Sequence, residues 1–339
     1  MTTIYWYVIG GVLIAGIIAL IPVGYVLTRV APFAYPNARV RAMRAKLIRT
    51  NDLLALTNRP YNDIIYHLEQ NHYPNLSSHA KANLSFANLD AALRSHLVAT
   101  LEKVARISPQ QTKPYLKALM KKYDIQVVQS VVRSLAAQTN IKTDILHETK
   151  VFTKEFVARE NHTLIDLQEE LKNTPLEKII SDHKQAIMQG ELKAFEQALD
   201  LHYFKQLLQA ANSEEAKNYT KRLIDNHNVA LIHKEETTLI PGGRIPAEEL
   251  EELDKKQLTE RLRSAGYTIT SEEPQLIERD LQASLKKYAQ ALLNKEPLSE
   301  ASIIGFVALK TINVRSTAIL LKMKYHDMTP QEITEVLAR

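Results

Sequence analysis

The chain reads Asp124-Ile-Gln-Val-Val-Gln-Ser-Val-Val-Arg133-Ser-Leu135, a stretch in which apolar side chains recur every three and four positions. This spacing places one set of side chains on a single face of an α-helix. The face is formed by Val127, Val128, Val131, Val132 and Leu135. Leu164, Leu167 and Leu171 repeat the pattern, and only short stretches such as 267–270 resemble a strand. We therefore predict an all-α fold.

Three sequences carry the signature of a helix start. Each combines a hydroxyl residue, a proline at the first helical position and Glu or Gln at the third. They are Ser108-Pro-Gln-Gln111, Thr174-Pro-Leu-Glu177 and Thr329-Pro-Gln-Glu332. We predict that a helix begins at each of these prolines.

The first stretch is one copy of a weak internal repeat. Residues 124–133 and 225–234 share an acid, a valine four residues later and a base nine residues later. Residues 313–322 keep the base without the acid or the valine, and the offsets are 101 and 88 residues. The spacing predicts three related helical units. An acid in the first turn and a base in the last are also favoured by any helix dipole, and nine residues are too far apart for the two charges to pair.

Composition excludes several classes of site. The chain has 339 residues and no cysteine, so disulfides, thiolate metal sites and cysteine nucleophiles are absent. Only nine glycines occur, and no glycine-rich phosphate-binding motif is among them. No metalloprotease or serine-hydrolase motif occurs either, and His67 and His72 are five residues apart, which misses the spacing of one helix face. We predict no catalytic, cofactor-binding or metal site, and no small-molecule substrate.

The positive charge of the chain is concentrated near one end. The formal net charge is +5, but residues 1–51 hold six Lys and Arg and no Asp or Glu. The remaining chain has 37 basic and 38 acidic residues, so the basicity is local. Aromatic residues do not alternate with these cations, which disfavours nucleic-acid binding and favours anionic membrane lipid or protein as the partner. The acidic run Glu248 to Asp254 has two interpretations, a solvated helix start and an electrostatic docking edge.

The amino-terminal residues predict a membrane anchor. Ile4 to Leu27 contain no charge, and as a helix they would extend about 36 Å, enough to cross a bilayer. Trp6 and neighbouring tyrosines suit the interface, and the positive charges that follow place the rest in the cytoplasm. A cleaved signal peptide is the alternative, but no Lys or Arg precedes the apolar run. We assign residues 1–30 to a single transmembrane anchor at the cell membrane.

Five stretches resemble one family. Residues Phe33-Ala-Tyr-Pro-Asn-Ala-Arg-Val-Arg-Ala-Met-Arg44 look like the opening of the C subunits of archaeal A-type ATP synthases, which are relatives of the d subunits of V-type ATPases. The 124–133 and 225–234 segments resemble the acid-to-arginine motif of that family, and Pro241-Gly-Gly-Arg244 resembles its Pro-Gly-Gly turn. Lys310 through Ile333 resembles its last helix pair. The chain departs from the family pattern at Val127, where Asn is usual, and at Asn313 and Ala318, where Glu and Arg are usual.

The resemblance implies a non-catalytic part of a proton- or sodium-driven rotary ATP synthase. Members of that family form a funnel of three similar helical bundles that connects the membrane rotor ring to the central shaft. The bundles would span 31–134, 135–240 and 241–339, behind the anchor. The resemblance implies rotor-ring and central-shaft subunits as partners, and we take Arg39, Arg41, Asp124, Arg133, Asp225, Lys234 and Lys310 as candidate interface residues. Two alternatives stay open: a single-pass membrane-anchored helical adaptor for another cytoplasmic partner and, without any motif, a membrane-tethered hydrolase.

Overall fold

Helices make up all the regular structure in the described part of the chain. The computed structural model describes residues 24, 28, 30–74, 76–79, 86–139, 141, 151–159, 161–236, 238–295 and 299–337. The all-α prediction is confirmed there, and residues 267–270 run between helices without forming a strand ladder. The anchor residues Ile4, Trp6 and Leu27 lie outside the described residues.

Six long helices form three hairpins, each a pair of helices in contact across a short turn. The pairs are α6 (Phe86–Ile107) with α7 (Lys113–Ala136), α13 (Lys193–Ala210) with α14 (Glu214–His233), and α17 (Pro274–Asn294) with α18 (Glu300–Tyr325). Residues 108–112 and 211–213 connect the first two pairs, and in the third pair α17 ends at Asn294 shortly before α18 begins at Glu300. The three repeated segments lie in α7, in and just after α14, and in α18, so the sequence repeat falls on the second helix of each hairpin.

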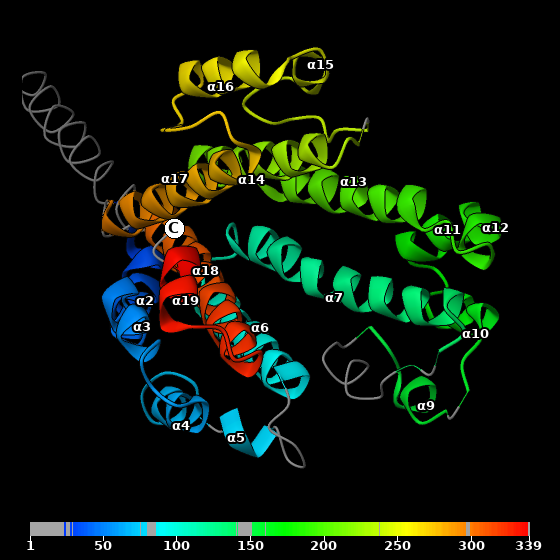
Figure 1. Cartoon of the computed structure of the whole chain (residues 1–339), viewed down its shortest axis with the longest axis horizontal. Helices are drawn as coiled ribbons and strands as arrows, with labels where there is room; N and C mark the ends of the chain where they lie inside the picture. The colour runs from blue at the N-terminus through cyan, green and yellow to red at the C-terminus, as the bar shows by residue number, and fades with distance from the viewer. Residues whose placement is uncertain are drawn as a thin grey trace, which may run out of the picture.

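Shorter helices cap the outer side of each hairpin. Figure 1 shows them at three corners of the molecule, with the long helices between them. The first corner holds a 3-10 turn η2 (Ala31–Phe33), α2 (Ala34–Arg44), α3 (Thr50–Leu56), α4 (Tyr61–Asn71) and α5 (Leu76–His79). The second holds α9 (Lys154–Val157), α10 (Leu164–Glu170), α11 (Pro175–Asp182) and α12 (Lys184–Met188). The third holds α15 (Ala247–Glu251) and α16 (Lys255–Ser264), and α19 (Pro330–Leu337) packs beside α3 and α18.

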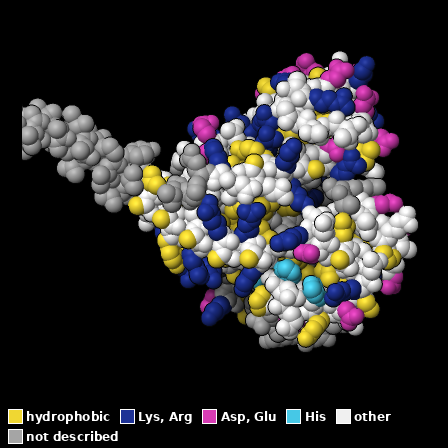
Figure 2. Space-filling view, turned by 90° about the vertical axis from the view of Figure 1, so that its left-hand side faces the viewer, with side chains coloured by type: hydrophobic (Ala, Val, Ile, Leu, Met, Phe, Trp, Pro, Cys, Tyr) yellow, Lys and Arg dark blue, Asp and Glu magenta, His cyan; other side chains and the backbone are white. Residues whose placement is uncertain are grey.

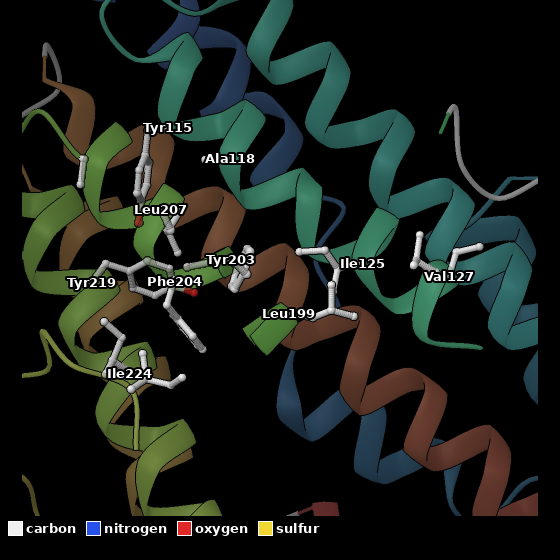
Figure 3. Packing of buried hydrophobic residues seen from close by; sticks show 14 of the residues in the cluster. Tyr115, Ala118, Ile125, Val127, Leu199, Tyr203, Phe204, Leu207, Tyr219 and Ile224 are labelled. Carbon is white, nitrogen blue, oxygen red and sulfur yellow. The ribbon is translucent and has the colours of Figure 1, made fainter. Parts of the chain in front are cut away.

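Three hydrophobic clusters join the hairpins in a circle. In each cluster the second helix of one hairpin packs against the first helix of the next: α7 against α13, α14 against α17, and α18 against α6. Figure 3 shows the first of these, where Tyr115 of α7 lies near Leu207 of α13 and Tyr219 of α14. Because α7 packs on α13, this cluster crosses the expected boundary between residues 134 and 135. Each hairpin is therefore stabilised by contacts with the other two hairpins as well as by contacts among its own residues.

Helix α18 is the central packing element. Among the described helices it alone is long and apolar enough to cross a membrane, yet 56% of its apolar stretch is buried inside the protein. It contacts α17, α6, α2, α14, α4 and α19. At Gly305 the backbones of α18 and α17 approach so closely that a Cβ atom would lie 2.7 Å from the carbonyl oxygen of Ala289. A glycine is required at this crossing because it has no Cβ.

Two of the three predicted helix starts are confirmed, and one is wrong. The α19 start is a complete capping arrangement: Thr329 donates to Glu332 Oε2, and the Glu332 amide donates back to Thr329 Oγ1. Helix α11 begins at Pro175 as expected. Ser108 instead closes α6, because its hydroxyl donates to the Val104 carbonyl 2.7 Å away. The next helix begins only at Lys113, after a turn.

Candidate partner interface

Helix α2 presents a basic outer face. Phe33, Pro36, Asn37 and Val40 follow the helical spacing and are buried, which leaves Arg39, Arg41 and Arg44 exposed. Exposed Lys46 and Arg49 continue the basic surface beyond the helix. On the face shown in Figure 2, Lys and Arg side chains gather in the middle, whereas Asp and Glu lie mostly toward the edges. The predicted cations Arg39 and Arg41 are therefore accessible to a partner.

Polar contacts fix this basic helix to the last hairpin. The buried Asn37 side chain donates to the carbonyl of Ser299 at 3.0 Å, and Arg44 donates to Asn294 Oδ1 at 2.8 Å. Both acceptors lie at the turn between α17 and α18, more than 200 residues away in the sequence. These two contacts fix the position of α2 relative to α17 and α18.

Asp225, a candidate interface residue, is buried in this structure, and its role as a partner contact stays a prediction. It is 0% exposed on α14, and its Oδ1 accepts the backbone N–H groups of Arg244 at 2.9 Å and Ile245 at 3.3 Å. Its Oδ2 accepts the Tyr267 hydroxyl at 2.5 Å. Burial raises the pKa of this carboxyl, although the three donors oppose the shift. The carboxylate holds the Pro-Gly-Gly turn, and a Cβ at Gly243 would collide with it.

The third repeated segment contains a matching arrangement. Asn313 on α18 replaces the acid and binds the Ile48 backbone, accepting its N–H at 3.2 Å and donating to its carbonyl at 2.8 Å. The Tyr73 hydroxyl donates to Asn313 Oδ1 at 3.3 Å, as Tyr267 does to the acid in the second segment. An amide suits this position because it can both donate and accept. In the second and third segments this repeated position thus holds the residue that binds a neighbouring loop to the long helix.

Lys310 is also buried, and its role as an interface residue likewise stays a prediction. It is 4% exposed, and its Nζ lies 4.3 Å from the centroid of the Tyr73 ring. Burial first, and the charge of Lys46 second, lower the pKa of Lys310 to about 8. Lys310 precedes Asn313 by three residues, and Arg222 precedes Asp225 by the same interval and also lies over a tyrosine ring. No sequence pattern indicated this burial, because charges usually mark the exposed face of a helix.

The remaining candidates lie nearer the surface. Arg133 near the end of α7 is exposed and forms a 2.6 Å ion pair with Glu196 of α13, which raises the pKa of the guanidinium. Lys234 is exposed and follows the last residue of α14, where a cation favours the helix dipole. Asp124 is half-buried on α7. The structure brings Arg133 and Glu196 together across two hairpins, but leaves Lys234 open to a partner.

One pair of titratable side chains was not predicted from the sequence. Asp200 of α13 and His227 of α14 lie 3.4 Å apart, Oδ2 to Nε2, and the His227 ring is 5.1 Å from the ring of Phe204. Burial raises the pKa of Asp200 to about 6 and lowers that of His227 to about 4. At neutral pH the pair is therefore a carboxylate beside a neutral imidazole. In the described chain no group of three His, Asp or Glu side chains is arranged to hold a metal.

Comparison with known proteins gives one consistent family. The model of a family described as ATP synthase (C/AC39) subunit matches residues 36–336. The chain is 24% identical to the A-type ATP synthase C subunit of Thermococcus onnurineus, with 93% of each chain covered. It is 27% identical to the protein of that name from Thermococcus kodakarensis, with 91% of each covered, and 22% identical to that from Pyrococcus furiosus, with 93% and 92% covered.

Proposed function

The chain belongs to the ATP synthase (C/AC39) subunit family, and from that premise we propose that it is the non-catalytic central-stalk subunit of an A-type rotary ATP synthase. In this role it couples the membrane rotor ring to the central shaft during ion-driven ATP synthesis or hydrolysis. The observation that carries the proposal is the family match over residues 36–336 together with three linked helical hairpins. Its partners are other subunits of the same complex.

The way the hairpins are joined suits a part that transmits torque. Each hairpin turn is short, and each hydrophobic cluster ties one hairpin to the next. Close packing resists deformation, so a twist applied at one hairpin passes to the others. We propose that the three hairpins, each with its short helices, form the funnel of three related bundles, 31–134, 135–240 and 241–339. The tip of the central shaft would enter between these bundles.

The basic face of α2 is proposed to lie toward the membrane. Arg39 and Arg41 are exposed there, and the predicted anchor, residues 1–30, ends just before α2. Cations beside a bilayer attract anionic head groups with about 1 kcal/mol each. This surface would keep the subunit seated on the ring and its surrounding lipid, and the anchor would hold it on the rotation axis.

Copurification tests the role directly. A tagged full chain is isolated from gently solubilised membranes, and the accompanying proteins are identified. Ring and shaft subunits together are the expected result. Unrelated proteins alone would favour the membrane-anchored adaptor, and ATP hydrolysis by the isolated chain would contradict a non-catalytic role. A chain lacking residues 1–28 should be retained on the ring less well, and undiminished retention would argue against the anchor as the element that holds the subunit there.

A charge-matched pair of variants tests the basic face. Replacing Arg39 and Arg41 with Gln should weaken retention on the ring and its lipid roughly tenfold or more at low salt, with less effect at high salt. Replacing the exposed Lys255 and Lys256 of α16 with Gln removes the same charge at another corner of the molecule. Equal losses in the two double variants would contradict a specific role for α2.

A further inference from the structure

Two arginines share one tyrosine ring where α14, α17 and the segment after the Pro-Gly-Gly turn meet. The Cζ atom of Arg222 lies 4.5 Å from the ring centroid of Tyr288 and 5.2 Å from that of Tyr267. The Cζ atom of Arg244 is also 5.2 Å from the centroid of Tyr267. Tyrosine faces attract guanidinium groups and hold them in a fixed plane. Two like charges are thus held close together by aromatic contacts.

No described carboxylate forms an ion pair with either arginine. Asp225, the acid at this site, has its oxygens occupied by two backbone amides and the Tyr267 hydroxyl. Nearby Glu249 and Glu215 are paired with Arg261 and Lys295. Burial first, and the charge of Arg244 second, lower the pKa of the Arg222 guanidinium. The charge of Asp225 opposes this shift of the Arg222 pKa, and Arg244 in turn lowers the pKa of Asp225. Two guanidinium groups therefore share one buried carboxylate.

The donors of these guanidinium groups are also incompletely used. Arg244 Nη1 is buried and has no hydrogen-bond partner within the described chain, and Arg222 Nη1 has only a long 3.5 Å contact to Ser284 Oγ. A buried donor without an acceptor costs about 1–3 kcal/mol. Both side chains are partly exposed, although the Nη1 atom of Arg244 is itself buried.

The third repeated segment shows what the fold itself needs at this position. There a single cation, Lys310, lies over Tyr73, whose hydroxyl binds Asn313. One cation over one tyrosine ring is sufficient for that arrangement. Arg244 is the additional cation in the second segment, so two cations there share the single carboxylate of Asp225.

We propose that Arg222 and Arg244 form a binding site for a phosphate group. Each guanidinium offers a planar fork of N–H donors that matches the oxygens of phosphate, and the Ser284 hydroxyl is positioned to add a further donor. Tyr267 is 5% exposed, so its ring is not available to stack a nucleotide base. The group is supplied either by free inorganic phosphate or by the head group of an anionic lipid.

The first arm of the test uses inorganic phosphate. The full chain in a neutral detergent is titrated calorimetrically with phosphate at constant ionic strength. Saturable binding is expected, and Arg222→Gln and Arg244→Gln should each lower the affinity about tenfold or more. Arg222→Lys, which keeps the charge but loses the fork, should also weaken binding. Lys287→Gln, an exposed cation on α17, is the charge-matched control and should change the affinity less than about twofold.

The second arm separates the two sources of phosphate. The same proteins are mixed with phosphatidylcholine nanodiscs with and without phosphatidic acid. Binding that needs phosphatidic acid and both arginines identifies a lipid head group, whereas saturation by inorganic phosphate alone identifies the free ion. Circular dichroism confirms that each variant is folded. The proposal is wrong if folded wild type binds neither ligand, or if the arginine variants bind as wild type does. The two arginines would then only stabilise the fold or bind an acidic side chain of a partner.

Discussion

Replacing Lys310 with Met should stabilise the protein at neutral pH. Lys310 is 4% exposed, and its only described ring contact is the 4.3 Å approach to Tyr73. No described carboxylate is paired with it. Met has a similar length and no charge, so it should fill the same space without the cost of burying an ammonium group.

The magnitude follows from the shifted pKa of Lys310. Burial lowers it from 10.5 to about 8, which corresponds to about 3 kcal/mol of destabilisation while the group is charged. This penalty is present in full below pH 8 and disappears as the pH rises through 10.5, the unfolded value. Loss of the cation–π contact offsets about 1–2 kcal/mol. We therefore expect a net gain of about 1–2 kcal/mol at pH 7.

Urea unfolding followed by circular dichroism between pH 7 and 10 provides the assay. Wild-type stability should increase relative to the Met variant from about pH 8 upward. Tyrosines away from residue 310 affect both proteins equally and cancel in the difference, and the pKa of Tyr73, which burial raises to about 12, lies above the pH range used. Lys322→Met, an exposed position on the same helix, should show no such pH-dependent difference. If the stabilities of Lys310→Met and wild type change with pH in parallel, the pKa of Lys310 is not lowered by burial, and the reasoning is refuted.

Three further changes test the packing. Gly305→Ala should lower the stability by about 1–3 kcal/mol, seen as a reduced thermal midpoint, because the new methyl group meets the Ala289 backbone; an unchanged midpoint would mean that α17 and α18 are not this close. Asp225→Ala should remove about 2–4 kcal/mol by leaving two buried amides without an acceptor, while Asp225→Asn should lose less. Arg133→Gln should change the stability by under about 1 kcal/mol, since its pair with Glu196 is exposed, and a larger loss in a denaturant titration would contradict that.

Much of the local structure was predictable because it depends on neighbouring residues. The spacing of the valines in 124–135 places them on one helix face, and Val127, Val128, Val131 and Val132 are all buried. The Thr329 cap was predictable for the same reason, since every group involved lies within four residues. The start predicted after Ser108 failed because its hydroxyl had a closer acceptor in the preceding helix.

The site depends on contacts that no local pattern contains. Asp225 matched an interface motif, yet its partners Arg244 and Tyr267 lie about 20 and 40 residues later and enclose it. Asp200 and His227 belong to different helices and meet only when α13 and α14 pair. Charge in a helix predicts exposure on average, and Lys310 and Asp225 are exceptions made by tertiary packing.

Cryo-electron microscopy of the intact complex, purified through a tag on this chain, tests the central claim most directly. We predict density for the three hairpins on the rotation axis, between the membrane ring and the central shaft, with the basic face of α2 toward the bilayer. A map that places the polypeptide at the stationary periphery, or that lacks it, would contradict the coupling role.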